Sequence, residues 1–391
     1  MRVMNEAMHV AYEGELFVQI FERAKSLHPD FSTKVKPIQG ECYESYLGIS
    51  DSDRALIENQ VEIIFHVAAY VNFNAPLRKA GYINVRSLDH LFDIAKEMKH
   101  LKAFVYVSTA FSPSTETNFI EEKFYHPPLN SRKLLSMLDD LDDAVLDEIT
   151  PSLMKSYSNR YIFTKLIAED LFRERASGLP ACIFRPSIVL PCYKEPLPGW
   201  INNAYSVIAI TLGYALGILK VVRANASFRA CMVPGDYSTN ALILSAYYTS
   251  KSWQQDKSWE KFQFDVPIVN YSNCTTKFRI TWEIFKIQGI KATEKYPFYD
   301  MPPLRFQRIY QKVHKFMDVM VPFSTRELTV STRNINEIWE TLSKKDKKLF
   351  YCNLDDINID DYSDVIVRGV RLYLANDKEE TISKARRKLF V

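Results

Sequence analysis

The sequence is poor in cysteine, in net charge and in signs of export. Its six cysteines are scattered through 391 residues without a Cys-x-x-Cys or Cys/His pairing. Neither a metal site nor a disulfide framework is therefore indicated, and a reducing compartment is expected. The 50 Lys and Arg residues nearly balance 47 Asp and Glu residues, which argues against nucleic acid as a partner. Residues 1–30 lack a signal-peptide pattern, because Glu6, Glu13 and Glu15 interrupt the apolar runs.

Long apolar runs are also scarce, with one exception at residues 204–219. No charged residue occurs from Pro196 to Leu219, and Gly213 and Gly217 form a Gly-x-x-x-Gly pair of the kind that packs membrane helices. A spanning helix needs roughly 20 apolar residues, and the clean part of this run is shorter. We therefore favour a buried or substrate-lining segment over a membrane span.

The sequence does contain an alternation of short apolar strands and helices. Residues 61–69, 103–109 and 181–189 are apolar runs of strand type, the first of them typical of a buried strand, and helices are expected at 88–100 and 154–177. Strands that are apolar on both faces and alternate with helices predict an α/β fold with a doubly wound, parallel, Rossmann-like sheet.

Upstream of these strands, residues 1–30 are expected to be mostly helical and residues 34–40 to form a short strand.

The strand ends of this sheet carry small or polar residues. Ligands of doubly wound sheets bind at the carboxyl ends of the strands. The residues at those ends are Gly40-Glu41, Ala68-Ala69, Ser108-Thr109 and Arg185-Pro186-Ser187. Together they make a single cleft plausible.

Tyr161 and Lys165 lie four residues apart in the helix expected at 154–177. This spacing places a phenol and an ammonium on one helix face, where the positive charge favours the phenolate. Such a tyrosine can exchange a proton with an alcohol or carbonyl oxygen. Taken alone, the pattern fits an ordinary helical pair better than a catalytic one, because the chain has 22 tyrosines and the spacing often arises by chance.

The C-terminal part differs in composition. Pro297, Pro302 and Pro303 suggest a linker, so we predict one domain over residues 1–300 and a helical domain over residues 301–391. Basic residues are interspersed with apolar ones there, which fits either a solvated helical face or docking to a membrane surface. The basic residues at its start are Arg305, Arg308, Lys312 and Lys315.

Several motifs occur together in a characteristic order. They are Ile57–Ala69 with its His66-Val67-Ala68-Ala69, Tyr82–Arg86, Val107–Phe111, Tyr161–Lys165, Phe184–Ser187, Glu195–Asn203, Val233–Asp236 and, near the end, Arg326-Glu327, Trp339 and Lys384–Arg387. In this combination the chain resembles the alcohol-forming fatty acyl-CoA reductases, which are extended short-chain dehydrogenase/reductases with a C-terminal helical domain.

The resemblance implies a role for each catalytic position. Tyr161 would donate a proton to the substrate carbonyl oxygen. Lys165 would hold the ribose hydroxyls of the nicotinamide nucleotide and lower the Tyr161 pKa. Thr109, with Ser108 as its rival, would hydrogen-bond the substrate oxygen.

The same resemblance implies that NADPH is the cofactor. Ala68, Ala69 and Asn84 would lie along it, and Arg185, Pro186 and Ser187 would pack near the nicotinamide. The turn Gly40-Glu41-Cys42 would meet the adenine, at a position where the family more often has aspartate than Glu41.

The chain departs from the family pattern at both ends. The family begins with a strand and a Gly-x-x-Gly-x-x-Gly turn that binds pyrophosphate, whereas the first 40 residues here contain only Gly14 and Gly40. We therefore expect an N-terminally truncated sheet that lacks an inner strand and begins near the end of the first crossover. The hydrophobic segment common beyond the family's C-terminal domain is also missing before Val391.

The implied function is the NADPH-dependent reduction of long-chain fatty acyl-CoA to fatty alcohol. The protein would be intracellular, at the endoplasmic reticulum or peroxisomal membrane, with acyl-CoA as its partner and possible contact with the membrane surface. One alternative is another extended reductase or epimerase acting on a sterol or nucleotide sugar. The other is a non-catalytic protein that binds acyl-CoA or membrane without a cofactor.

Overall fold

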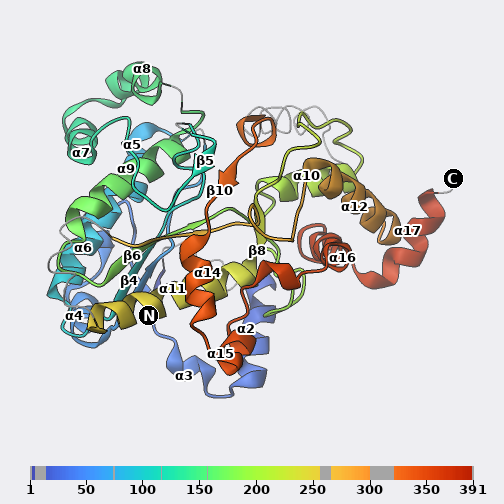
Figure 1. Cartoon of the computed structure of the whole chain (residues 1–391), viewed down its shortest axis with the longest axis horizontal. Helices are drawn as coiled ribbons and strands as arrows, with labels where there is room; N and C mark the ends of the chain where they lie inside the picture. Colours follow the sequence, from blue (N-terminus) through green and yellow to red (C-terminus); the bar gives the residue numbers. More distant parts are fainter. Residues whose placement is uncertain are drawn as a thin grey trace. The chain divides into compact units, whose positions relative to one another are not determined.

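The computed structural model describes residues 2–4, 15–73, 75–115, 117–155, 157–255, 266–299 and 321–389. The chain forms two compact units and passes repeatedly between them (Figure 1). The first unit comprises Met1–Pro186, Ala241–Tyr271 and Thr332–Ser343, and the second comprises Ser187–Asn240, Ser272–Ser331 and Lys344–Val391. The predicted boundary after residue 300 stays a prediction, because residues 300–320 lie outside the described residues.

The first unit contains a four-stranded parallel sheet in the order β3-β4-β6-β9. Parallel neighbours need crossover connections, usually helices, which cover the apolar faces of the strands. The register places Val105 opposite Cys182. The predicted α/β fold with a parallel, Rossmann-like sheet is confirmed. The strands are Ile63–His66 (β3), Ala103–Val107 (β4), Ala181–Pro186 (β6) and Ile268–Tyr271 (β9).

Strand β3 differs from the buried strand that the sequence predicted. Ile63 is 44 % exposed, Phe65 39 % and Val67 57 %. Within the described residues β3 pairs only with β4, so it is an edge strand of this sheet. The apolar run alone could not show this, because the burial of a strand depends on the neighbours that cover it.

The N-terminal part also differs from the prediction. Residues 1–30 were expected to be mostly helical, which holds for α2 (Glu15–Leu27) but not for Arg2–Met4, which form strand β1. Strand β1 pairs in parallel with β2 (Pro37–Gln39). These two strands form a separate two-stranded sheet in the described part of the chain. The absence of an inner strand between the two sheets stays a prediction.

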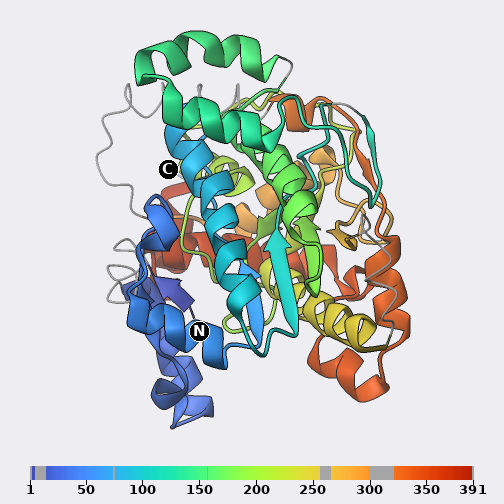
Figure 2. The same cartoon turned by 90° about the vertical axis from the view of Figure 1, so that its left-hand side faces the viewer.

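Helices α6 (Ser87–Glu97) and α9 (Arg160–Arg175) pack side by side in the first unit (Figures 1 and 2). An aromatic cluster fixes them to the sheet. Phe92 of α6, Phe104 of β4 and Phe172 of α9 are fully buried, with ring centroids 4.9, 5.1 and 5.5 Å apart. Each ring pair contributes about 0.5–1.5 kcal/mol beyond its buried area. The cluster therefore holds the C-terminal part of α9 against the amino-terminal end of β4.

The other elements of the first unit are short. They are α3 (Phe31–Lys34), η1 (Ser45–Gly48), α4 (Asp51–Gln60), α5 (Leu77–Gly81), the π-helix η2 (Tyr82–Arg86), β5 (Phe119–Ile120), α7 (Ser131–Asp140), α8 (Asp143–Met154) and α14 (Arg333–Glu340). Helix α11 (Gly235–Gln255) begins in the second unit and continues into the first.

The second unit combines a parallel strand pair with helices. Its C-terminal part is mainly helical, as predicted, although Arg305, Arg308, Lys312 and Lys315 lie outside the described residues. The elements are β7 (Ile188–Leu190), α10 (Val207–Ala215), β8 (Met232–Pro234), α12 (Trp282–Lys295), β10 (Thr329–Val330), α15 (Lys344–Leu349), η4 (Leu354–Asp356), α16 (Ile359–Gly369), the π-helix η5 (Val370–Leu374), η6 (Glu379–Thr381) and α17 (Ile382–Leu389).

The apolar segment at residues 204–219 contains only the nine residues of α10 as helix. Val207 and Ile208 are buried there, whereas Tyr205 and Tyr214 are exposed. In the described ranges no helix has the length and apolar character needed to cross a membrane.

Two glycines make a close backbone contact in the second unit. Gly199 has a φ of +75°, and a Cβ atom on Gly369 would overlap the carbonyl oxygen of Gly199. Gly289, in α12, has no atom within 4 Å of a Cβ built on it. The end of α16 can therefore approach the Gly199 turn only without a side chain at residue 369.

We expect Gly369→Ala to destabilise the protein by about 2–4 kcal/mol, because the added methyl meets backbone that cannot rotate away. The matched variant Gly289→Ala should be neutral or stabilising by up to about 1 kcal/mol, since alanine is the better helix former. Urea unfolding followed by circular dichroism measures both changes. Equal stability of the two variants would show that the glycine contact does not constrain the fold.

Candidate active site

Tyr161 and Thr109 meet in the first unit. Thr109 follows the end of β4, and Tyr161 lies in the first turn of α9, which begins after the cap residue Asn159. The Asn159 side chain accepts a hydrogen bond from the backbone N–H of Ile162 at 2.9 Å, which fixes the start of the helix. The Tyr161 hydroxyl lies close enough to the Thr109 side chain for Thr109 to act on the Tyr161 pKa. The structure thus brings together the two side chains that the sequence placed at one strand end.

The expected acidic shift of Tyr161 is wrong for this structure. Burial raises the pKa of Tyr161 to about 12, and the nearby Thr109 side chain only partly opposes this rise. Lys165 does not lower it, because its Nζ donates to the backbone oxygen of Val107 at 2.6 Å and lies 4.6 Å from the ring centre of Tyr106. A spacing of four residues places two side chains on one helix face, but it does not aim them at each other.

Lys165 is itself strongly perturbed. The side chain is almost fully buried, and burial lowers its pKa to about 7, while the nearby carboxylate of Glu169 acts in the opposite direction. The ammonium therefore titrates near physiological pH. Its charge depends on a balance between desolvation and one buried anion.

Unpartnered polar atoms lie close to Lys165. The ring of His66 stacks on Tyr106 with centroids 5.8 Å apart. Burial and the charge of Lys165 lower the pKa of His66 to about 3, so this imidazole is neutral. Neither the His66 Nε2 nor the Tyr106 hydroxyl, both buried, has a hydrogen-bond partner among the described residues. Such atoms mark a place where a polar ligand would gain hydrogen bonds.

Ser108 was the rival of Thr109 for the substrate oxygen, and its hydroxyl is engaged elsewhere. It donates to Oε1 of Glu169 at 2.5 Å. Arg185 binds the same carboxylate through Nε at 2.9 Å and through Nη2 at 2.5 Å. Both charged side chains are almost fully buried, at 0 % and 1 % exposure. Ser108 and Arg185 therefore form an internal network instead of lining a cleft.

Glu169 is the residue of this site that the sequence reasoning missed. It lies four residues after Lys165, on the same helix face, so the repeated spacing from Tyr161 to Lys165 to Glu169 was the available signal. The spacing could not show that its partner is Arg185, which comes from the following strand.

Asn84 was expected to lie along the cofactor, and its side chain holds a loop instead. Its Oδ1 accepts from the backbone N–H of Tyr70 at 2.7 Å, and its Nδ2 donates to Tyr70 O at 3.3 Å and to Thr164 Oγ1 at 2.9 Å. Asn84 thus ties the segment that follows Ala68 and Ala69 to helix α9. Those alanines are exposed and half-buried, respectively.

The remaining predicted positions are spread over other strand ends. Gly40, Glu41 and Cys42 follow β2 in the two-stranded sheet, where burial, followed by the Glu41 charge, raises the pKa of Cys42 to about 11. Pro186 ends β6. Ser187 begins the second unit, and its buried hydroxyl has no partner within the described residues.

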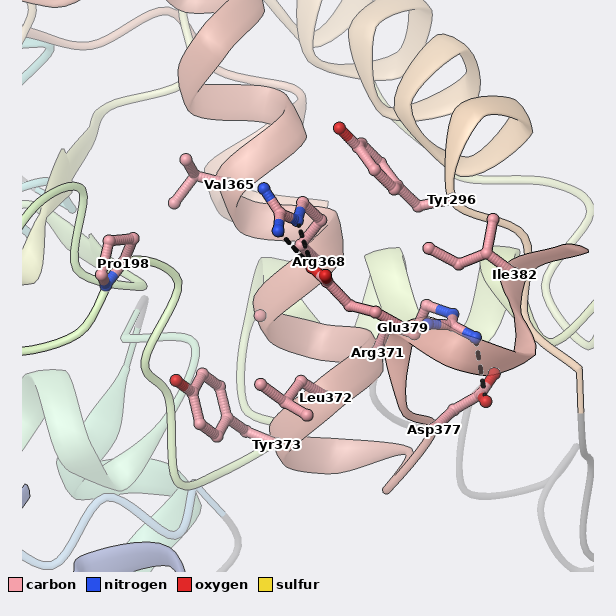
Figure 3. A pocket seen from close by; sticks show the side chains of 11 residues that line it. Pro198, Tyr296, Val365, Arg368, Arg371, Leu372, Tyr373, Asp377, Glu379 and Ile382 are labelled. Carbon is pink, nitrogen blue, oxygen red and sulfur yellow. Dashed lines mark hydrogen bonds and ion pairs between the residues drawn. The ribbon is translucent and has the colours of Figure 1, made fainter. Parts of the chain in front are cut away.

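The second unit contains a cavity of about 230 Å³ (Figure 3). Two of its lining arginines already face carboxylates, Arg368 with Glu379 and Arg371 with Asp377. Tyr296 and other apolar or aromatic residues complete the wall. Both arginines among the described lining residues are therefore already paired, and neither is left to bind a phosphate or carboxylate ligand.

Comparison with known proteins places this site in a family. Two family models, each described as male sterility protein, match the chain: an NAD-binding model over residues 9–242 and a second over residues 284–377. Fatty acyl-CoA reductase wat of Drosophila melanogaster is 30 % identical over 404 residues, covering 94 % of this chain and 76 % of that protein. Fatty acyl-CoA reductase 1 of Homo sapiens is 29 % identical over 405 residues, covering 96 % and 78 %.

Solved structures agree on the fold. The terminal R domain from the myxalamid PKS-NRPS biosynthetic pathway superposes with a TM-score of 0.57 at 16 % identity, covering 89 % of this chain and 77 % of that one. A thiolation-reductase di-domain from an archaeal non-ribosomal peptide synthetase gives 0.51 at 14 % identity, covering 95 % and 75 %. With the matched models and relatives, these findings show that the chain belongs to the fatty acyl-CoA reductase family of male sterility proteins.

Proposed function

We propose that this chain reduces long-chain fatty acyl-CoA to the fatty alcohol with NADPH. The observation that carries the proposal is the proximity of Tyr161 to Thr109, just after the carboxyl end of β4, with Lys165 one turn further along α9. The names of the relatives supply the substrate class.

The residues near Lys165 fit the nicotinamide riboside end of the cofactor. The Lys165 ammonium would hold the ribose hydroxyls, and the unpartnered atoms of His66 and Tyr106 offer further hydrogen bonds to a polar ligand. The backbone after β3, at Ala68 and Ala69, would run beside it. When bound, NADPH supplies the hydride.

Side chains of the protein then donate the proton and bind the substrate carbonyl oxygen. Tyr161 and Thr109 would both hydrogen-bond the carbonyl oxygen and stabilise the charge that develops on it. A raised pKa keeps the Tyr161 phenol protonated at neutral pH, as a proton donor requires. Protonation of the thioester-derived oxyanion gives a hemithioacetal, which expels the coenzyme A thiol. The resulting aldehyde is reduced to the alcohol at the same residues.

A second candidate is a non-catalytic protein that binds acyl-CoA or a membrane surface without cofactor. Its support comes from strand β3 of the described part of the chain. The exposed face of β3 agrees with this candidate, because a complete doubly wound sheet covers such a strand.

Titration of the purified chain with NADPH, followed by its fluorescence, separates the two candidates. Binding in the micromolar range is the result expected for the reductase. If no binding is detected up to millimolar NADPH, while the chain is folded by circular dichroism, the non-catalytic candidate replaces the reductase.

Tyr161→Phe should lower the rate of alcohol formation by about 10²- to 10⁴-fold, because it removes the proton donor. NADPH affinity should stay within about twofold of the wild-type value, since the ring is retained. The matched control is Tyr247→Phe, at an exposed position of α11, which should leave the rate unchanged. Product formation is measured by gas chromatography. Full activity of Tyr161→Phe would remove Tyr161 from the proposed role.

The activity should fall as the pH rises through about 7, because Lys165 loses its charge there. Glu169→Gln should move this fall to lower pH, since it removes the anion that stabilises the ammonium. Ser108→Ala is the control, because it deletes a hydrogen bond to Glu169 but leaves the carboxylate in place. The pH profile of kcat/KM measures the shift. An unchanged profile in a folded Glu169→Gln variant would contradict this assignment.

A further inference from the structure

Two cysteines approach each other closely in the second unit. Cys231 lies just before β8, and Cys274 comes shortly after β9. Their sulfur atoms are 2.8 Å apart, compared with about 2.05 Å in a disulfide bond. Both residues are buried, with 5 % and 1 % exposure. Their distance along the chain gave no sign of this pairing, because the six cysteines follow no spacing rule.

A backbone clamp holds the two thiols in place. The Oδ1 of Asn273 accepts from the N–H of Met232 at 3.0 Å, and its Nδ2 donates to the backbone oxygen of Ala230 at 3.2 Å. Asn273, the neighbour of Cys274, thus hydrogen-bonds to the backbone of the residues on both sides of Cys231. The clamp therefore holds the backbone around Cys231 beside the backbone around Cys274.

The surroundings of the two sulfurs are unequal. Cys274 Sγ accepts a hydrogen bond from the Ser272 hydroxyl at 3.2 Å, and it shares a second one with the Cys231 sulfur, in which either thiol can donate. These hydrogen bonds, with the nearby charge of Arg229, lower the pKa of Cys274. The pKa of Cys231 is raised, because its proton is shared with Cys274 and its site is buried. The hydrogen bond from Ser272 therefore favours Cys274 as the thiolate, with Cys231 as the thiol beside it.

The other cysteines provide a contrast. Burial raises the pKa of Cys42 to about 11 and the pKa values of Cys182, Cys192 and Cys352 to about 12. A cysteine with a raised pKa carries little thiolate and reacts slowly. Cys274 differs from these four in the direction of its shift.

We propose that Cys274 and Cys231 form a redox-active dithiol that reacts with hydrogen peroxide and closes into a disulfide. The Cys274 thiolate attacks one peroxide oxygen, the O–O bond breaks, and the departing oxygen takes a proton to leave as water. The sulfenic acid on Cys274 then condenses with the Cys231 thiol, forming the S–S bond and releasing a second water. Two thiols are oxidised and one hydrogen peroxide is reduced to two waters.

Burial selects the oxidant. A peroxide close to water in size can reach a sulfur that is 1 % exposed, whereas glutathione disulfide is far larger. The new bond closes the chain from residue 231 to residue 274, a segment that leaves the second unit and returns to it. This proposal is independent of the reductase chemistry, because neither cysteine belongs to the predicted active site.

The test uses the full chain, reduced with dithiothreitol and then freed of reductant. Treatment with a few equivalents of hydrogen peroxide should lower the intact mass by about 2 Da, the loss of two hydrogens. Thiol blocking and peptide mapping should identify the Cys231–Cys274 bond. The oxidised chain should also melt about 5 °C higher than the reduced chain, since the bond restricts the unfolded state.

Variants assign the two roles. Cys231→Ser should stop at a sulfenic acid on Cys274, which dimedone traps once the chain is unfolded in its presence, and Ser272→Ala should slow bond formation several-fold. Cys182→Ser, the matched control for a buried cysteine with a raised pKa, should oxidise like the wild type.

The wild-type peptide map decides the proposal even if a variant fails to fold. Oxidation that begins at Cys42, bonds between two chains, or Cys231 and Cys274 that both remain open to alkylation after unfolding would each overturn it.

Discussion

The buried ion pair between Glu169 and Arg185 is the contact on which the first unit depends. One carboxylate holds Arg185 of β6 and the Ser108 hydroxyl after β4, and Arg185 also donates to the backbone oxygens of Glu121 and Lys123 at 3.2 and 3.0 Å. Two strand ends, one helix and one loop thus converge on a single pair of charges. Breaking a buried pair of this kind typically costs about 3–5 kcal/mol. The ion pair therefore fixes the position of α9 along its axis relative to the ends of β4 and β6. It thereby also fixes the position of Tyr161 in the first turn of α9.

Neighbouring residues at the end of β4 have different roles. Side chains of consecutive residues in extended chain point in opposite directions, and Ser108 and Thr109 fit this rule. The Ser108 hydroxyl binds the buried Glu169, whereas Thr109 meets Tyr161. The alternation of side chains could not predict which of the two hydroxyls would face Glu169, since either residue could have pointed inwards.

The sequence was sufficient for relations that follow from topology. Parallel strands end at one edge of a sheet, which was enough to place Thr109 at that edge, whereas its meeting with Tyr161 was implied by the resemblance to the reductase family. The sequence was insufficient where a side chain has several possible hydrogen-bond partners. Lys165 turns to the backbone of Val107, and Asn84 turns to the backbone of Tyr70. Strand β3 was misjudged for a related reason, because its apolar run does not reveal which neighbours cover it.

The alternation of the chain between the two units has a consequence for how the protein is made. The chain crosses after Pro186, Asn240, Tyr271, Ser331 and Ser343. Strand β9 and helix α14 therefore complete a unit whose other strands leave the ribosome much earlier. No single cut in the gene separates one unit from the other. Completion of the sheet must wait until late in translation, so the unfinished first unit becomes a natural client for chaperones.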